Sequence, residues 1–386
     1  MNRLVLAISA GEWEGINHRP HHFMRRCAAG GGKVLYLEPP ASLIAPLKDR
    51  RFLKRWKNWL KGLRKVEENL YVLAPPPVLP FGSKYRAVNK INQWFISRTV
   101  KRALKECGGG VPDIFTFLPS AVDLLSFIDH GIVVYDCVDD HAAFTGLINA
   151  DVVYQMEKEL MARADVSFAT ARQLYEDRKG WSGNFHIIPN GAEYEHFACT
   201  GNPPPVPEDC AGFFHPVAGF VGGISDWVDV DLIAAAAQQL PEVTFVLIGP
   251  VLTDVSCFKG LDNVKLLGAR PYASLPGYVH FFDVCLIPFR INKLTESVNP
   301  IKMYEYLSAG KPVVSTPLPE VLAYGDVVMI AREGQETAAA IRKALEPDAR
   351  SEEMVRLRQQ VARENSWDAR WQTAAELIVM CREKKE

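Results

Sequence analysis

Residues 298–317 read VNPIKMYEYLSAGKPVVSTP, and this stretch predicts a short helix followed by a buried strand. Pro300 suits the first turn of a helix, where its missing N–H costs no hydrogen bond, and Gly310 suits the position just past the helix end. The free N–H groups and positive dipole end at the start of such a helix favour a bound diphosphate, and Lys302 lies in the first turn. Glu305, one turn further on, is placed to accept hydrogen bonds from ribose hydroxyls. The alternative is that Lys302 and Glu305 form an exposed pair on an amphipathic helix.

Outward from this stretch, short apolar runs alternate with helix-length segments along both halves of the chain. Runs that are apolar on both faces of a strand indicate a parallel sheet covered by helices. The first set is 4–8, 33–37, 70–73, 113–117, 133–135, 166–170 and 186–188, and the second is 217–221, 244–248, 264–266, 284–287, 312–315 and 327–330. A segment rich in Pro and Gly, 199–216, lies between the sets and is typical of a linker. We therefore expect two α/β domains.

Length, charge and cysteine usage bound the class of protein. The 386 residues are too many for one ordinary core and fit two domains. A formal net charge of −1 gives no field that would attract the whole molecule to nucleic acid, so we expect no nucleic-acid partner. The eight cysteines are scattered like reduced thiols, the N-terminus resembles a buried strand more than a signal peptide, and no apolar run approaches the ~18 residues of a membrane span. These features predict a cytoplasmic protein.

Residues 298–317 resemble the donor-nucleotide helix of GT-B glycosyltransferases, especially family 4 and related bacterial cell-surface polysaccharide enzymes. Three other segments agree in order and spacing: GFVGGISDW (219–227) resembles a Gly-rich turn, IIPNGAEYEHF (187–197) the junction between domains, and TFVLIGP (244–250) the next strand. ENSWDARWQTAAELI (364–378) resembles the C-terminal helix that crosses back to the first domain.

The resemblance implies an α/β protein of GT-B fold, with two Rossmann-like domains and a deep inter-domain cleft. The acceptor-side domain is expected over 1–198, joined by the C-terminal helix 367–386. The nucleotide-sugar donor domain is expected over 199–366. In such folds ligands bind at the carboxyl ends of strands.

The resemblance also implies the donor-binding residues. The second glutamate of the family's E-x7-E motif contacts the donor ribose and matches Glu305, whereas the first falls at Ser297, with Glu296 one place off. The segment after the Gly-rich turn is acidic where many members carry Arg and Lys, so we infer that cations elsewhere neutralise the diphosphate. Absent side chains in the turn let a phosphate come close, although an ordinary tight turn is the alternative. The expected set is Gly222, Gly223, Arg290, Lys293, Ser297, Asn299, Pro300, Ile301, Lys302 and Glu305.

A strand in the N-terminal half ends in three ionisable side chains. VVYDCVDDHAAF (133–144) carries Asp139, Asp140 and His141, which we predict to be the catalytic candidates, as a base or as electrostatic support for the transition state. The alternative is that one aspartate caps the following helix. The GT-B resemblance does not need a metal, so we expect no metal site and no cofactor, with the nucleotide sugar as donor substrate.

The segment SAGEWEGINHRPHH (9–22) follows the first strand, where similar enzymes place an acceptor-facing loop. The acceptor-side candidates are Gly11, Arg19 and His22. A metal role for His21 and His22 is disfavoured, because adjacent residues of a helix do not face one another.

Residues 48–65, KDRRFLKRWKNWLKGLRK, carry nine Lys or Arg against one Asp. Apolar residues at helical spacing predict one basic amphipathic helix with aromatic anchors, a composition that favours adsorption to an anionic membrane. The alternative is a helix that packs on the N-terminal sheet with solvated charges. The membrane interpretation implies a lipid-linked acceptor, such as a polyprenyl-diphosphate sugar, and a peripheral location at the inner face of the cell membrane.

These observations together predict a glycosyltransferase of hexosyltransferase type, metal-independent and retaining. It would move a sugar from a nucleotide diphosphate sugar to a glycan or lipid-linked acceptor in bacterial surface polysaccharide biosynthesis. Three alternatives stay open: a GT-B epimerase, a glycoside phosphorylase, and a non-catalytic nucleotide-sugar-binding protein, which the missing first glutamate suggests.

Overall fold

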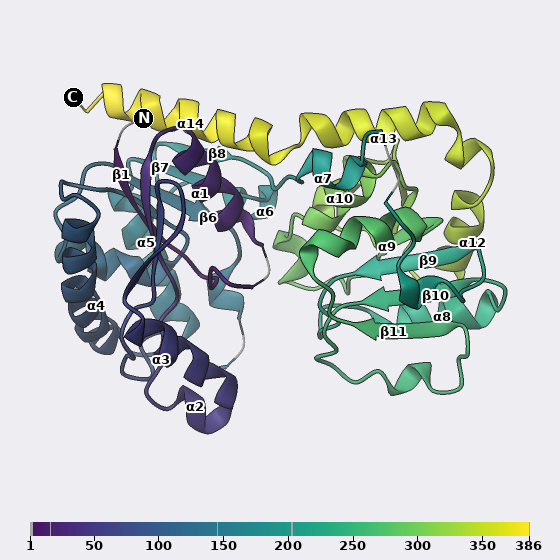
Figure 1. The fold of residues 1–386 in the computed structure, drawn as a ribbon, viewed down its shortest axis with the longest axis horizontal. Coiled ribbons are helices and arrows are strands. Elements are labelled where there is room, and N and C mark those ends of the chain that lie inside the picture. Colours follow the sequence, from purple (N-terminus) through teal and green to yellow (C-terminus); the bar gives the residue numbers. More distant parts are fainter. Residues whose placement is uncertain (1–2, 16, 145, 202–203, 386) are drawn as a thin grey trace. The chain divides into compact units, whose positions relative to one another are not determined.

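The structure is a computed structural model that describes residues 3–15, 17–144, 146–201 and 204–385. The chain forms two compact units (Figure 1): unit 1 is Met1–Pro189 with Trp371–Glu386, and unit 2 is Asn190–Arg370. The predicted boundary after residue 198 falls later than this division. The reason is helix α7 (Tyr194–Ala198), which packs on helices of unit 2 and buries Phe197 completely in its core.

Unit 1 is built on an eight-stranded sheet in the order β3-β4-β2-β1-β5-β6-β7-β8. Every neighbouring pair is parallel except β3 with β4. The strands are β1 (Leu4–Ile8), β2 (Lys33–Leu37), β3 (Leu63–Glu67), β4 (Leu70–Leu73), β5 (Asp113–Thr116), β6 (Val133–Cys137), β7 (Val166–Ala169) and β8 (Phe185–Ile187). The main helices are α1 (Arg19–Ala29), α4 (Arg86–Glu106), α5 (Ala150–Arg163) and α6 (Arg172–Arg178). The parallel strands are those that the apolar runs predict.

The prediction of one helix over 48–65 is wrong. The segment contains the end of α2 (Ala45–Lys48), the 3-10 turn η1 (Arg50–Phe52), α3 (Leu53–Leu60) and most of strand β3. Gly62, with φ +68°, ends the helical part because the left-handed region favours glycine. The chain then pairs antiparallel with β4, whose free edge supplies backbone hydrogen bonds that helical periodicity does not reveal.

Unit 2 contains a six-stranded, fully parallel sheet in the order β11-β10-β9-β12-β13-β14. Its strands are β9 (Val217–Val221), β10 (Thr244–Ile248), β11 (Val264–Gly268), β12 (Val284–Ile287), β13 (Val313–Ser315) and β14 (Val328–Ile330). Its helices are α7, α8 (Val230–Gln239), α9 (Leu275–Phe281), α10 (Ile301–Ser308), α11 (Pro319–Leu322), α12 (Gly334–Ala344) and α13 (Glu352–Glu364). Each of these strands was predicted. The two parallel-sheet units confirm the α/β fold class.

Helix α14 (Trp367–Glu383) begins in unit 2 and continues into unit 1. Trp367 is fully buried, and the ring of Trp371 lies edge-on to Phe23 of α1 at 5.4 Å between centroids. The part of the helix from Trp371 onward therefore belongs to unit 1 and packs there. None of the helices in the described part of the chain is long and apolar enough to span a bilayer.

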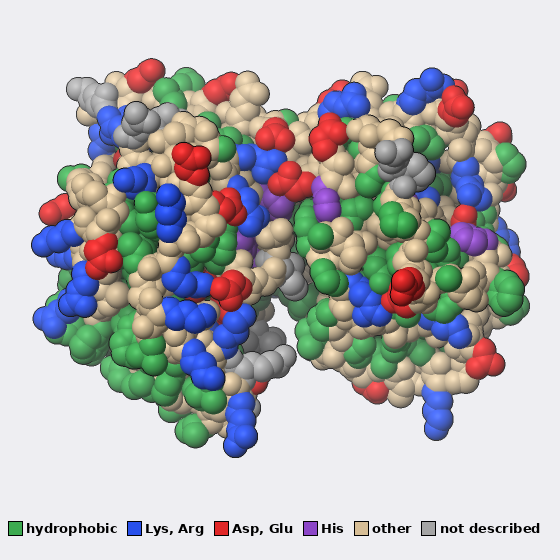
Figure 2. Space-filling view, viewed as in Figure 1, with side chains coloured by type: hydrophobic (Ala, Val, Ile, Leu, Met, Phe, Trp, Pro, Cys, Tyr) green, Lys and Arg blue, Asp and Glu red, His purple; other side chains and the backbone are tan. Residues whose placement is uncertain are grey.

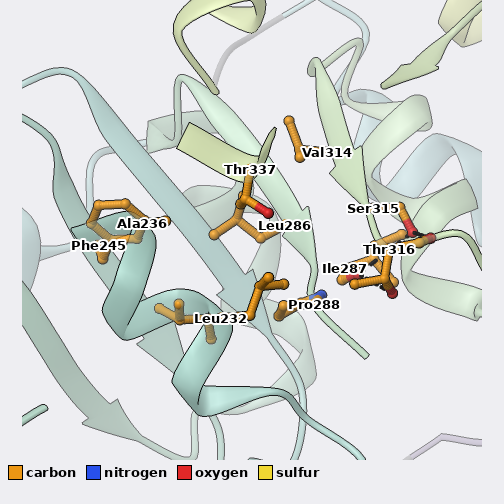
Figure 3. A pocket seen from close by; sticks show the side chains of 11 residues that line it. Leu232, Ala236, Phe245, Leu286, Ile287, Pro288, Val314, Ser315, Thr316 and Thr337 are labelled. Atoms are coloured by element: carbon orange, nitrogen blue, oxygen red, sulfur yellow. Dashed lines mark hydrogen bonds between the residues drawn. The ribbon is translucent and has the colours of Figure 1, made fainter. Parts of the chain in front are cut away.

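The core of unit 2 contains a small cavity of about 10 Å³ between α8, α12 and the sheet. Figure 3 shows Thr337 of α12 near Leu286, with Leu232 and Phe245 also lining the space. The Thr337 hydroxyl is buried and has no hydrogen-bond partner among the described residues. A buried hydroxyl without a partner costs about 1–3 kcal/mol.

Thr337→Val is therefore expected to raise the free energy of unfolding by about 1 kcal/mol, because valine keeps the shape and removes the polar atom. Urea unfolding followed by circular dichroism measures the change. Thr337→Ser keeps the hydroxyl and enlarges the cavity, so it should lower stability. A destabilised Thr337→Val would contradict this account of the cavity.

Candidate donor site and acceptor-side cluster

The predicted helix start is present at α10. Pro300 occupies the N-cap position, Ile301 begins the helix, and Gly310 follows its end with φ +70°. The first backbone N–H groups of a helix have no partner within the helix and carry the positive end of its dipole. α10 follows β12 in the chain, so its N-terminus lies at the carboxyl edge of the sheet of unit 2, where an anion is favoured.

Lys302 and Glu305 contact each other directly, with Nζ 2.6 Å from Oε2. Glu305 is buried, at 4% exposure, while Lys302 is half-buried. The pair therefore differs from the exposed surface pair that was the alternative. A buried carboxylate beside a lysine at a helix N-terminus can accept hydroxyl hydrogen bonds while the ammonium turns to a phosphate.

Asn299 holds the residues before α10 in place. Its side-chain N–H groups donate to Tyr304 Oη (3.2 Å) and Glu320 Oε2 (3.1 Å), and its Oδ1 accepts from the Asn190 backbone N–H (3.0 Å). The Asn190 side chain in turn donates to the Asn299 carbonyl (2.8 Å). Both amide hydrogens of Asn299 are thus used inside unit 2, which favours a positioning role over a direct donor contact.

Two loops far apart in sequence lie side by side at this edge. The loop after β9 donates from Asp229 N to Pro288 O (2.7 Å), and the loop after β12 donates from Arg290 N to Trp227 O (2.8 Å). Gly222 and Gly223 belong to the first loop, and Ser297 to the second. The structure therefore brings the predicted donor residues to the carboxyl ends of the neighbouring strands β9 and β12.

The cations of these loops differ in their surroundings. Arg290 contacts two aspartates of the acidic segment, Asp231 at 2.8 Å and Asp229 at 3.4 Å, so its charge is already compensated. Lys293 is exposed on the same loop. Ser297, at the position of the first glutamate, is buried, whereas Glu296 is exposed.

The Gly-rich turn depends on a glycine that the sequence analysis did not single out. Gly249 follows β10 with φ +150°, and a Cβ there would lie 1.8 Å from the Gly222 carbonyl oxygen. At Gly223 the nearest atom to a Cβ would be Ser225 Oγ, at 3.6 Å, which is ordinary contact. Packing within the protein thus requires glycine at 249 but not at 223.

This difference separates a structural glycine from a ligand-facing one. Gly249→Ala is expected to destabilise unit 2 by about 1–3 kcal/mol through strain. Gly223→Ala should leave stability within about 0.5 kcal/mol of wild type and still weaken nucleotide binding, because the new methyl group occupies space near the phosphates. Thermal unfolding and nucleotide titration calorimetry measure the two effects. Wild-type nucleotide affinity in Gly223→Ala would remove Gly223 from the site.

The acidic turn of unit 1 follows β6. His141, in the turn η3 (His141–Ala143), is buried and its Nε2 donates to the Phe117 carbonyl (3.0 Å). Asp140 precedes η3 without a side-chain capping bond and contacts Arg178 at 3.1 Å. Burial raises the pKa of Asp139, which the nearby His141 partly offsets. Burial thus shifts the pKa of Asp139 in the direction that favours a role in proton transfer.

A buried ion network lies beneath this turn and was not predicted. Arg178 of α6 donates from Nε and Nη2 to the two oxygens of Glu157 on α5, at 2.8 and 3.1 Å. The hydroxyl of Tyr135 also donates to Glu157 (2.8 Å). Arg178 and Glu157 are fully buried, so the network fixes the position of Arg178, which in turn contacts Asp140.

Of the predicted acceptor-side residues, Gly11 lies in the loop between β1 and α1, whereas Arg19 and His22 belong to α1. Arg19 is buried and donates from Nε to Asp136 Oδ2 (2.7 Å) and from Nη1 to the Pro189 carbonyl (2.9 Å). Burial raises the pKa of Asp136, and Arg19 opposes that shift. His22 is also buried, and the Gly11 carbonyl accepts from the Tyr36 hydroxyl (3.0 Å). These positions favour structural roles for Arg19 and His22, and their contact with an acceptor stays a prediction.

Basic side chains of 48–65 hold the loop between β1 and α1. Arg55 Nε lies 2.5 Å from Glu12 Oε1, and Arg64 Nη1 lies 2.5 Å from Glu14 Oε1. The hydrogen bond from Arg64 lowers the pKa of Glu14. Part of the positive charge that the sequence assigns to a membrane helix is therefore compensated within unit 1.

His21 is fixed in one neutral tautomer. Its Nδ1 accepts from the His18 backbone N–H (3.1 Å), so Nε2 carries the proton and donates to the Glu12 carbonyl (3.0 Å). Burial is the main reason that the pKa of His21 is lowered from 6.5 to about 4. Both ring nitrogens are engaged, which leaves neither for a metal ion. Among the described residues, no group of three or more His, Cys, Asp or Glu side chains is arranged to hold one.

Stability should therefore fall as the pH decreases from 6.5 to about 4, because the unfolded chain binds a proton at His21 in this window and the folded chain does not. The contribution is at most about 3 kcal/mol. Urea unfolding at a series of pH values measures it, and His21→Gln should flatten the decline. An equally steep decline in the variant would show that other groups cause it.

A comparison with known protein families matches part of unit 2. Residues 215–347 match the family model described as Glycosyl transferases group 1. TuaH of Bacillus subtilis (strain 168), named as a teichuronic acid biosynthesis glycosyltransferase, is 34% identical over 204 residues, which are 48% of this chain and 51% of TuaH. The match thus spans about half the length of this curated relative.

Solved structures extend the similarity to the whole chain. Sucrose-phosphate synthase from Thermosynechococcus elongatus has a TM-score of 0.73 and 16% identity over 98% of each chain. HepE of Anabaena in complex with UDP has a TM-score of 0.67 and 16% identity over 98% of this chain and 100% of its own. Such low identity shows the fold alone and confirms the prediction of GT-B, whereas family 4 stays a prediction. Residues 215–347 are thus similar to the glycosyl transferases group 1 family, within a chain of GT-B fold.

Proposed function

We propose that this chain is a glycosyltransferase that moves a sugar from a nucleotide diphosphate sugar to a glycan or lipid-linked acceptor. The observation that carries the proposal is the arrangement at the start of α10, where Lys302 and the buried Glu305 lie at a helix N-terminus beside the loops that follow β9 and β12. The UDP bound to HepE and the name of TuaH support a nucleotide-sugar donor and a role in bacterial surface polysaccharide biosynthesis.

In the proposed mechanism, the N–H groups of Ile301 and Lys302 and the Lys302 ammonium neutralise the diphosphate as it leaves. Glu305, released from Lys302, accepts the ribose hydroxyls. Gly223 gives the phosphates room, and Lys293 adds a mobile cation. Asp139 acts on the acceptor side as base or as electrostatic support, and burial raises its pKa in the direction that favours proton transfer. We propose a metal-independent, retaining hexosyl transfer, as the family resemblance implies.

We further propose that the chain works in the cytoplasm at the inner face of the cell membrane, with residues 48–65 in contact with anionic lipid. Leu53 and Leu60 of α3 are exposed, at 40% and 76%, as are Lys57 and Lys61. Apolar and basic side chains together on one exposed helix suit a lipid surface. A membrane location would suit an acceptor carried on a polyprenyl diphosphate.

Non-catalytic nucleotide-sugar binding is the second candidate function. The observation that favours it is Ser297, a small buried residue where the family motif has its first glutamate. Such a protein would bind the donor and turn over neither donor nor acceptor, so donor hydrolysis and product analysis separate it from an enzyme.

The donor proposal predicts that Lys302→Ala weakens nucleotide binding. Thermal-shift measurements against UDP, GDP, CDP and ADP, with and without magnesium, identify the base. The stabilising nucleotide should then bind Lys302→Ala at least about tenfold more weakly, because a charge-assisted contact to phosphate is worth about 1.5–3 kcal/mol.

Lys259→Ala, at an exposed lysine of unit 2, is the matched control and should bind like wild type. Unaltered nucleotide affinity in Lys302→Ala would remove the lysine from the donor site. No response of the wild-type protein to any nucleotide would contradict the proposed donor.

A further inference from the structure

Helix α4 presents an exposed face that the sequence analysis did not single out. The helix is 21 residues long and buries Asn89, Asn92, Ile96 and Val100 against unit 1, among others. The opposite face begins with apolar residues: Ile91 is 44% exposed, Trp94 38% and Phe95 47%. It continues with Arg98, Lys101, Arg102 and Lys105, all exposed. The helix contains no Asp or Glu before Glu106, so this face is mainly apolar in its first half, where Lys90 is also exposed, and mainly basic in its second.

The apolar half continues into the segment before the helix. Leu79, Phe81 and Tyr85 are exposed, at 40%, 38% and 54%, and Lys84 lies over the Tyr85 ring at 5.6 Å. The side chain of Asn92 ties this segment to α4, because it donates to the Leu79 carbonyl (2.9 Å) and accepts from the Leu79 N–H (2.9 Å).

A second connection leads from this segment to α2. Leu43 N donates to the Val78 carbonyl (2.8 Å), so the segments around Leu43 and Leu79 run next to each other. Leu43 and Leu47 are 47% and 86% exposed. Figure 2 shows hydrophobic side chains gathered over the lower left of unit 1, between α4 and α2, with Lys and Arg side chains at the edge. We call this set the α4 surface: Leu43, Leu47, Leu79, Phe81, Tyr85, Ile91, Trp94 and Phe95, with Lys84, Lys90, Arg98, Lys101 and Arg102.

Composition and charge indicate what the α4 surface contacts. Large contiguous apolar patches are rare on monomeric proteins and mark interaction sites. Trp, Tyr and Phe beside Lys and Arg are typical of side chains that lie at the boundary of a bilayer, with the ring among acyl chains and the cation at a lipid phosphate. Trp94 and Arg98 form such a pair directly, since the Arg98 guanidinium lies 3.8 Å from the centroid of the Trp94 ring.

We propose that the α4 surface docks on an anionic lipid bilayer, with Ile91, Trp94 and Phe95 inserted and Arg98, Lys101 and Arg102 at lipid phosphates. This extends the proposed membrane contact of 48–65 to a second helix. The purpose of this docking rests on the proposed function: contact with the bilayer would bring unit 1 to a lipid-linked acceptor. Vesicle binding without donor or acceptor tests it separately from glycosyl transfer.

A second copy of the chain fits the α4 surface less well. In a two-fold contact the same face of both copies meets, and Glu106 is the single carboxylate that the basic half of α4 offers to its counterpart. Most cations of the α4 surface in each copy would then be brought together or desolvated without a partner, which opposes association. An anionic bilayer supplies the missing negative charge.

The test is co-flotation of the full chain with vesicles of phosphatidylcholine alone and of phosphatidylcholine mixed with phosphatidylglycerol. Wild type should bind only the anionic vesicles, and less with added salt. Arg98→Gln/Arg102→Gln should bind about 30-fold more weakly, at about 1 kcal/mol for each cation. Ile91→Ser/Phe95→Ser should bind at least about tenfold more weakly. The matched controls in unit 2 are Phe214→Ser and Lys259→Gln/Lys343→Gln, which remove exposed apolar and basic side chains and should bind like wild type.

All variants should retain the wild-type thermal midpoint and nucleotide response in the absence of vesicles, since these side chains are exposed. Wild-type vesicle binding in both α4 variants would overturn the proposal, even if Leu53→Ser/Leu60→Ser on α3 abolished binding. Failure of the wild-type protein to bind anionic vesicles would also overturn it. Light scattering that shows a dimer lost in Ile91→Ser/Phe95→Ser would assign the α4 surface to a second copy instead.

Discussion

The parallel pairing of β9 with β12 is the constraint on which the candidate donor site depends. Neighbouring parallel strands end at the same edge of a sheet, so the loops 222–229 and 288–299 meet although about sixty residues of chain separate them. The backbone bonds from Asp229 to Pro288 and from Arg290 to Trp227 fix that meeting. Without it, the Gly-rich turn and the start of α10 would not lie at the same edge of the sheet.

Two of the cations of the candidate donor site are already paired with carboxylates. Lys302 contacts Glu305, and Arg290 contacts Asp229 and Asp231, so these cations already have partners in the described structure. A bound diphosphate has to compete with carboxylates for them. The helix N-terminus has no such competitor by nature, since its charge arises from backbone dipoles. We therefore expect the start of α10 to supply much of the fixed attraction for phosphate, with Lys302 adjusting to the ligand.

The elements that were predicted correctly are those with a local signal. The β-branched and aliphatic runs identified every parallel strand of both sheets, and Pro300 and Gly310 marked the ends of α10. Strand β3 was missed because it forms by pairing with the edge of β4, and its sequence alone resembles a basic helix. Only the Gly62 turn gave a local hint of where the helix ends.

Contacts between distant segments account for the rest of the site. Gly249, the pair Arg19–Asp136 and the network around Glu157 and Arg178 are set by tertiary packing, and a single sequence carries no signal for such pairings. They change the interpretation of the candidate residues: Asp140 contacts Arg178 and His141 donates to the Phe117 carbonyl, whereas burial raises the pKa of Asp139. These contacts distinguish the candidate residues from one another, and their roles in a donor or acceptor site stay predictions.

The most direct test of the central claim is hydrogen–deuterium exchange of the full chain with and without the stabilising nucleoside diphosphate. The account predicts slower exchange in two separate stretches, 221–226 and 297–305, because both loops face one ligand at the edge of the unit 2 sheet. Protection confined to unit 1, or to only one of these stretches, would contradict a donor site built on β9 and β12.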